Sequence, residues 1–161
     1  MRVAVIGAGP SGLVTLKYLL TACDFLDTGP VEAVLFESES SVGGDLVSSK
    51  QLTTFSDFRP HDSDPDFLST DRYVEHLNEY CTHFGLWEHI KLSTSVVSIR
   101  RNGNRGHIIG YRHQDCPDTA EYECDAVAIC SGLHVTPNIP EVKGMDRVPT
   151  VFDSSEFKKR S

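Results

Sequence analysis

A glycine-rich turn near the N-terminus, GAGPSG over residues 7–12, constrains the fold of this chain more than any other stretch. Residues 2–6 before it are apolar and β-branched, which predicts a buried strand, and residues 10–22 after it show a helical pattern. Between a strand and a helix, Gly7 allows the tight turn and Gly9 leaves the backbone open to a pyrophosphate, while Gly12 lets helix and strand pack closely. The turn therefore predicts the first half of a dinucleotide-binding βαβ unit.

The start of this helix is the expected phosphate site. The backbone between Gly9 and Gly12, which includes Pro10 and Ser11, forms the first helical turn, where N–H groups have no partner within the helix. Those N–H groups and the positive end of the helix dipole favour a bound anion.

The next predicted strand ends on a carboxylate. Residues 31–36 are apolar and β-branched, and Glu37 follows them directly. In a dinucleotide-binding βαβ unit, an acidic residue at this place accepts a hydrogen bond from a ribose hydroxyl. Glu37 would repel a 2′-phosphate, so this site suits FAD or NAD better than NADP.

The remainder of the chain predicts an α/β fold with additions. Residues 52–66 are polar and proline-containing, which indicates a loop, and residues 71–84 form a helix capped by Ser69 or Thr70 and ended by Gly85. Residues 96–100 and 107–112 predict a β-hairpin, and Tyr122 begins a further short strand. Residues 125–130 predict another buried strand, so we expect a Rossmann-like domain with an inserted helix and β-hairpin.

Charge and composition exclude several other classes of protein. A net charge of −8 disfavours nucleic-acid binding, which depends on basic side chains. The five cysteines form no CxxC pair and the seven histidines no metal-binding motif, so no metal site is expected. No apolar run is long enough to cross a membrane, and reduced thiols fit a cytoplasmic protein.

Several later segments resemble one family of flavoproteins. Residues 37–44, ESESSVGG, resemble the stretch after the second strand in flavoproteins with two dinucleotide-binding domains, where the glycine pair, here Gly43 and Gly44, lies against the FAD. Residues 49–58, SKQLTTFSDF, resemble an SKxxxxFSDF segment of flavin-containing monooxygenases, and residues 125–132, DAVAICSG, resemble their strand and turn at Ser131 and Gly132. PNIP at residues 137–140 follows in the same order. By these segments the chain resembles the N-terminal, FAD-binding part of a flavin-containing monooxygenase of a fungal-type subgroup.

The resemblance implies a function and its cofactors. Members of the family use NADPH and O₂ with bound FAD to oxygenate the nitrogen or sulfur of a small nucleophilic substrate, as N,N-dimethylaniline monooxygenases do. FAD carries this chemistry while the protein binds and orients it, so no catalytic side chain is assigned. The implied FAD contacts are the turn residues already named, Glu37, the Gly43–Gly44 pair and the Ser131–Gly132 turn.

The sequence also departs from the family. It holds no second GxGxxG for NADPH, so we expect residues 1–161 to form one incomplete FAD/NAD(P)-binding domain without the NADPH-binding domain. Val47 occupies a position where many members have an asparagine that faces the flavin, and Asp153 replaces the histidine of a later motif. A non-catalytic FAD-binding remnant is therefore an alternative, whereas an FAD-dependent disulfide reductase would require a redox cysteine pair that the sequence lacks.

Overall fold

The computed structural model describes residues 1–44, 49–103, 105–132 and 142–148. It divides the chain into two units, Met1–Ser131 and Gly132–Ser161. Among the described residues of the second unit, the 3₁₀ turn η3 spans Met145–Arg147. The expectations for Val47, Asp153 and residues 137–140 lie outside the described residues.

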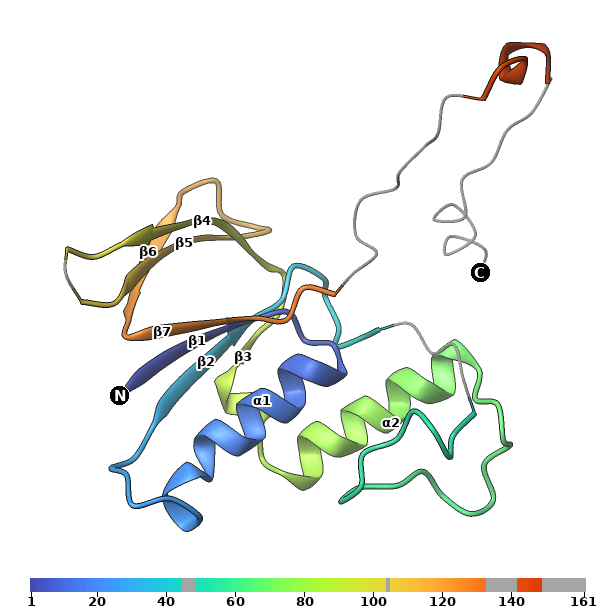
Figure 1. Cartoon of the computed structure of the whole chain (residues 1–161), viewed down its shortest axis with the longest axis horizontal. Coiled ribbons are helices and arrows are strands. Elements are labelled where there is room, and N and C mark those ends of the chain that lie inside the picture. The colour runs from blue at the N-terminus through green and yellow to red at the C-terminus, as the bar shows by residue number, and fades with distance from the viewer. Residues whose placement is uncertain (45–48, 104, 133–141, 149–161) are drawn as a thin grey trace. The chain divides into compact units, whose positions relative to one another are not determined.

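A four-stranded parallel sheet forms the centre of the first unit (Figure 1). Its strands are β1 (Arg2–Ile6), β2 (Glu32–Phe36), β3 (Ile90–Lys91) and β7 (Ala126–Ile129), in the order β3-β2-β1-β7. Ile6 is in register with Phe36 on one side and with Ile129 on the other, so three strands end at the same level. Gly7, Glu37 and the chain after Ile129 therefore follow the carboxyl ends of three neighbouring strands. Ligands bind at this end of the sheet in folds of this class.

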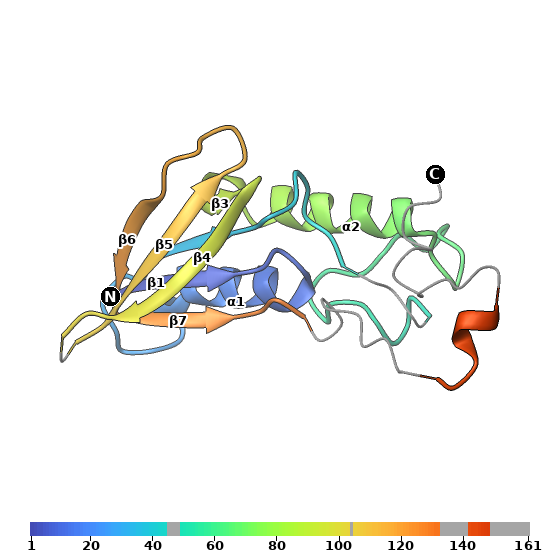
Figure 2. The ribbon, with the colours of Figure 1, turned by 90° about the horizontal axis from the view of Figure 1, so that it is seen from above.

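Helices cover one face of this sheet and a second sheet covers the other (Figures 1 and 2). The helices are α1 (Pro10–Leu20) and α2 (Thr70–His83), with 3₁₀ turns η1 (Ala22–Asp24) and η2 (Trp87–His89). The second sheet is antiparallel, in the order β4-β5-β6, and consists of β4 (Thr94–Arg101), β5 (His107–His113) and β6 (Ala120–Cys124). The predicted hairpin is confirmed as β4 and β5, and the predicted α/β fold is confirmed with it.

Each layer is held by its own apolar cluster. On the helical face, the buried leucines of α1 pack with buried side chains of α2, which include Leu77 and Tyr80. On the other face, the ring centroid of Phe36 lies 5.0 Å from that of Tyr111 and 5.7 Å from that of Tyr122. Phe36 thus anchors the antiparallel sheet to the end of β2, directly before Glu37.

Three sequence expectations need correction. The first helix ends at Leu20 and continues as η1, since the apolar pattern alone does not define where the α-helical turns end. The strand predicted over residues 125–130 forms as β7, but it is not buried: its residues are half-buried and Ile129 is 68% exposed. β7 pairs only with β1 in the described part of the chain, and its apolar residues remain partly uncovered for that reason. The sequence also gave no sign of β3, which has only two residues.

The N-terminus of α2 offers a first test of the fold. The Ser69 hydroxyl accepts a hydrogen bond from the backbone N–H of Arg72 at 3.2 Å, which decides between the two predicted caps. Replacing Ser69 with alanine leaves that N–H without its side-chain acceptor, and we expect the free energy of unfolding to fall by about 1 kcal/mol. Urea denaturation measures the change, with Thr70→Ala as the matched control. Equal effects of the two substitutions would contradict the assignment of Ser69 as the cap.

Candidate functional site

The glycine turn after β1 is closed on both sides by backbone. Gly7 has a φ of 103°, and a Cβ placed there would lie 2.5 Å from the carbonyl oxygen of Cys130. A Cβ on Gly12 would lie 1.8 Å from the carbonyl oxygen of Gly7. Neither position has room for a side chain, so the first and third glycines are required by the packing of the turn itself.

The start of α1 is left open for an anion. Gly9 is the N-cap, Pro10 occupies the first turn, no described side chain caps the helix, and its first turn holds no acidic residue. The backbone N–H groups of Ser11 and Gly12 belong to this first turn, where a helix has no carbonyl to accept them. The backbone N–H groups and the positive end of the helix dipole at the start of α1 are suited to bind a pyrophosphate.

The glycine pair lies directly against this turn. The N–H of Gly43 donates to the carbonyl oxygen of Ala8 at 3.3 Å. A Cβ on Gly44 would lie 3.0 Å from the Cδ atom of Pro10, and a Cβ on Gly9 would lie 3.3 Å from the carbonyl oxygen of Gly43. Two glycine-containing segments, 31 or more residues apart in sequence, therefore make backbone contact where the cofactor was expected.

Glu37 lies beside the same turn. Its Oε2 atom accepts the backbone N–H of Ala8 at 2.6 Å. Its Oε1 atom accepts the N–H of Glu39 at 2.8 Å and the Ser38 hydroxyl at 3.1 Å. A carboxylate has about four acceptor positions, so three contacts leave capacity for a ribose hydroxyl.

Backbone hydrogen bonds hold the Glu37 segment to the neighbouring chain. The N–H of Glu37 donates to the carbonyl oxygen of Lys91 at 2.9 Å. The N–H of Thr94 donates to the carbonyl oxygen of Glu37 at 2.6 Å. Ser93 between them has a φ of 50°, and its N–H donates to the carbonyl oxygen of Glu39 at 2.8 Å. The Glu37 segment is thus held by residues 91–94, which begin in the short β3 that the sequence did not reveal.

The segment after β7 crosses the glycine turn. The N–H of Cys130 donates to the carbonyl oxygen of Ile6 at 2.8 Å, and the Cα atom of Ser131 would lie 3.3 Å from a Cβ on Gly7. Ser131 is therefore next to the turn, and its contact with the dinucleotide stays a prediction. Gly132 begins the second unit and has a φ of 80°, a conformation that favours glycine.

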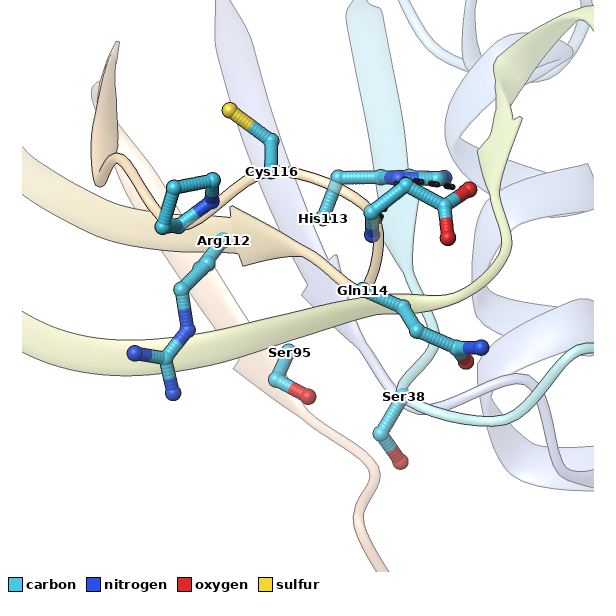
Figure 3. A pocket seen from close by; sticks show the side chains of 8 residues that line it. Ser38, Ser95, Arg112, His113, Gln114 and Cys116 are labelled. Atoms are coloured by element: carbon cyan, nitrogen blue, oxygen red, sulfur yellow. Dashed lines mark hydrogen bonds and ion pairs between the residues drawn. The ribbon is translucent and has the colours of Figure 1, made fainter.

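A cavity of about 490 Å³ opens beside Ser38, the residue after Glu37 (Figure 3). Figure 3 shows Ser38 and Ser95 at the bottom of the cavity and Cys116 and His113 at the top. The lining continues around the end of β5 through Arg112, Gln114, Asp115 and Pro117. The cavity was not predicted, because it forms where three segments meet that are separate in sequence, at residue 38, residue 95 and residues 112–117.

The segment after the glycine pair is held by side chains. We define the strap as residues 49–69, which contain no helix or strand. The ammonium group of Lys50 donates to the backbone carbonyls of three strap residues, His61, Asp62 and Asp64. Arg72 of α2 donates to both carboxylate oxygens of Asp64, at 2.9 and 3.0 Å.

The Arg72–Asp64 pair makes the strap sensitive to acid. The hydrogen bond from Arg72 holds the pKa of Asp64 below its ordinary value. A lowered carboxyl pKa contributes stability above the unfolded pKa of about 3.9, and that contribution disappears as the pH falls through the lower folded value. We therefore expect Asp64→Asn to destabilise the chain at pH 7 and to make little difference at the acid end. Urea denaturation from neutral pH to pH ~2.5 measures this, and a difference that grows on acidification would contradict it.

The described residues contain no group of three or more His, Cys, Asp or Glu side chains that could hold a metal ion. None of the helices among them has the length and apolar character needed to cross a membrane.

Solved structures resemble this fold. Tmm from Pelagibacter sp. strain HTCC7211 superposes with a TM-score of 0.77 at 24% identity, over 92% of this chain and 40% of that one. The structure of OTEMO in complex with FAD and NADP gives a TM-score of 0.61 at 18% identity, over 89% of this chain and 28% of that one. At these identities the likeness concerns the fold.

Sequence comparison is more specific. The chain is 56% identical over 168 residues to the monooxygenase ptmN of Penicillium ochrochloron. The match covers 98% of this chain, which spans 28% of the length of that curated relative. The profile of the family described as flavin-binding monooxygenase-like matches residues 1–161. The chain that forms this glycine turn and places Glu37 beside it therefore belongs to the flavin-binding monooxygenase-like family.

Proposed function

We propose that this chain is the FAD-binding portion of an NADPH- and O₂-dependent flavin monooxygenase. The observation that carries the proposal is the convergence of the open start of α1, the Gly43–Gly44 backbone and the Glu37 carboxylate at one edge of the sheet. These groups fit a dinucleotide, because they offer N–H donors to a pyrophosphate and an acceptor to a ribose.

Each group then has a defined role. The backbone N–H groups of Ser11 and Gly12, presented by Gly9 and Pro10, hold the pyrophosphate, and the remaining acceptor capacity of Glu37 takes a ribose hydroxyl. The adenosine end of FAD extends past Ser38 into the neighbouring cavity. The Gly43–Gly44 pair and the Ser131–Gly132 turn lie along the dinucleotide, and Gly7 and Gly12 keep the turn closed beneath it.

The proposed reaction is the oxygenation of a nucleophilic nitrogen or sulfur in a small molecule. When bound, FAD supplies the redox chemistry, and NADPH supplies the reducing equivalents in the full-length enzyme. This chain's residues bind the dinucleotide and orient it. We further propose that residues 1–161 are one FAD-binding domain of a longer cytoplasmic enzyme whose NADPH-binding domain lies outside them, and that the acidic chain takes no nucleic-acid partner.

A ligand series tests the binding proposal. Calorimetric titration of the purified chain is expected to show one FAD per chain, and ADP should compete because it shares the pyrophosphate and adenosine. FMN, which lacks the adenylate, should bind about tenfold or more weakly, because it cannot reach Glu37. NADPH should also bind weakly at this site, since Glu37 faces its 2′-phosphate. Equal affinities for FAD and FMN would contradict the assigned roles, and a preference for NAD over FAD would favour a nicotinamide-binding domain.

Activity is tested separately. The sequence has no second GxGxxG, so the FAD-loaded chain alone is expected to show no NADPH-dependent O₂ consumption. Consumption above the rate of free FAD would contradict the proposed division between FAD and NADPH domains. A chain that fails to retain FAD at all would instead support the alternative of a non-catalytic remnant.

A further inference from the structure

Lys17 is a charged residue on the buried face of α1. Only 7% of its surface is exposed, and it lies between the apolar leucines that pack on the sheet. Its ammonium group forms an ion pair with Asp57 of the strap and lies 3.9 Å from the ring centroid of Tyr18 and 4.9 Å from that of Phe84. Burial opposes the charge of Lys17, but the hydrogen bonds and charge interactions with Asp57 and Tyr18 together outweigh it, so that the pKa of Lys17 is raised.

We expect the fold to tolerate loss of both charges of this pair together. Replacing both partners of a buried ion pair with apolar residues is often neutral or stabilising, whereas removing one partner leaves an uncompensated charge. Lys17 therefore needs Asp57 as its partner. The pair favours one register of the strap, that is, one alignment of the strap residues against the helices, because among the described residues only Asp57 forms an ion pair with Lys17.

Aromatic contacts on each side of Asp57 depend on that register. The ring centroid of Phe55 lies 4.2 Å from that of Tyr80, and the ring of Phe58 lies 5.2 Å from His76. His76 is 1% exposed, and neither of its ring nitrogens has a hydrogen-bond partner among the described residues. A slip of one strap residue would move Asp57 away from Lys17 and place a different side chain against this α2 face.

One helix links the strap to the proposed cofactor site. Gly44, near the start of the segment that becomes the strap, lies against Pro10 in the first turn of α1. Asp57 lies against Lys17, seven residues further along the same helix, which is two turns or about 10.5 Å. Gly44 and Asp57 thus both contact α1, the first beside the proposed pyrophosphate and the second two turns away.

We infer that Lys17 is a positioning residue, which through Asp57 fixes the register of the strap and so holds the Gly43–Gly44 backbone in the position that binds FAD. The inference rests on the proposed function. The Lys17–Asp57 pair is not among the proposed FAD contacts, and it acts on the Gly43–Gly44 backbone through α1 and the strap.

The test compares FAD affinity with fold stability in the full chain. The paired variant K17M/D57L removes both charges, so its melting temperature should stay within about 4 °C of wild type. Its FAD affinity should fall about tenfold, because the strap loses its register. Chymotrypsin should cut the FAD-loaded variant faster at the exposed strap residues Leu52 and Phe67. Wild-type affinity and wild-type cleavage in this folded variant would overturn the inference.

Single substitutions at Lys17 and Asp57 test each partner separately, and a second ion pair serves as the control. D57N keeps the shape of the side chain and should lose about tenfold in FAD affinity, while K17R, which retains the charge, should stay within about threefold of wild type. If the paired variant does not fold, an unchanged affinity of D57N overturns the inference. The exposed Arg100–Glu121 pair on the β4–β6 sheet is the matched control, and R100M/E121Q should leave FAD affinity unchanged. Absence of FAD binding by the wild-type chain would instead reject the proposed function.

Discussion

Replacing Gly12 with alanine is expected to lower the free energy of unfolding by about 3 kcal/mol. A Cβ at this position would lie 1.8 Å from the carbonyl oxygen of Gly7, which is a severe overlap with backbone. Gly7 cannot move aside easily, because it already lies against the backbone of Cys130. The added methyl must therefore push α1 away from the sheet at the point where β1, α1 and the chain after β7 meet.

Urea denaturation followed by circular dichroism measures this effect. Gly29→Ala is the control, because a Cβ there would have no atom within 4 Å, and its effect should stay within about 0.5 kcal/mol. If Gly12→Ala were as mild as Gly29→Ala, the close packing of helix and strand described for the turn would be wrong.

Replacing Glu37 with alanine is expected to weaken FAD binding about 30-fold. The substitution removes the proposed ribose acceptor and also the carboxylate that accepts the N–H of Ala8 at 2.6 Å in the glycine turn. A hydrogen bond to a charged group contributes about 1.5–3 kcal/mol, which corresponds to roughly 10- to 150-fold in affinity. Glu37→Gln should be milder, since an amide oxygen can still accept one N–H.

The neighbouring acid gives a matched control for Glu37. Glu39 contributes its backbone N–H to the Glu37 carboxylate, and Glu39→Ala keeps that N–H while removing a negative charge from the same loop. FAD titration by fluorescence should therefore show little change for Glu39→Ala. Equal losses for the two alanine variants would mean that loop charge, and not the position of the Glu37 carboxylate, governs affinity.

The part of the fold set by local patterns could be predicted from the sequence. The alternation of an apolar strand, three spaced glycines and an apolar helix is local, and β1, the turn and α1 follow from it. The helix predicted over residues 71–84 and the predicted hairpin have equally local signals, and both are confirmed, as α2 and as β4 with β5. Glu37 was predicted beside the turn from its place after β2, and its hydrogen bond to Ala8 places it there.

Features that depend on contacts between distant segments could not be predicted. β3 has two residues and is a strand only because β2 lies beside it. Lys17 interrupts an apolar pattern in the sequence, and only the structure shows Asp57, 40 residues away, as its partner. The exposure of Ile129 likewise depends on which strand covers β7 and not on the residues of β7.

The most direct test of the central claim is the backbone amide NMR spectrum of the chain with and without FAD. We expect FAD to shift the N–H signals of Ser11, Gly12, Gly43 and Gly44, and ADP to reproduce the shifts at Ser11 and Gly12. The signals of Arg100 and Glu121, which do not line the cavity beside Ser38, should not move. Binding of FAD without any shift at Ser11 and Gly12 would contradict the assignment of the glycine turn as the pyrophosphate site.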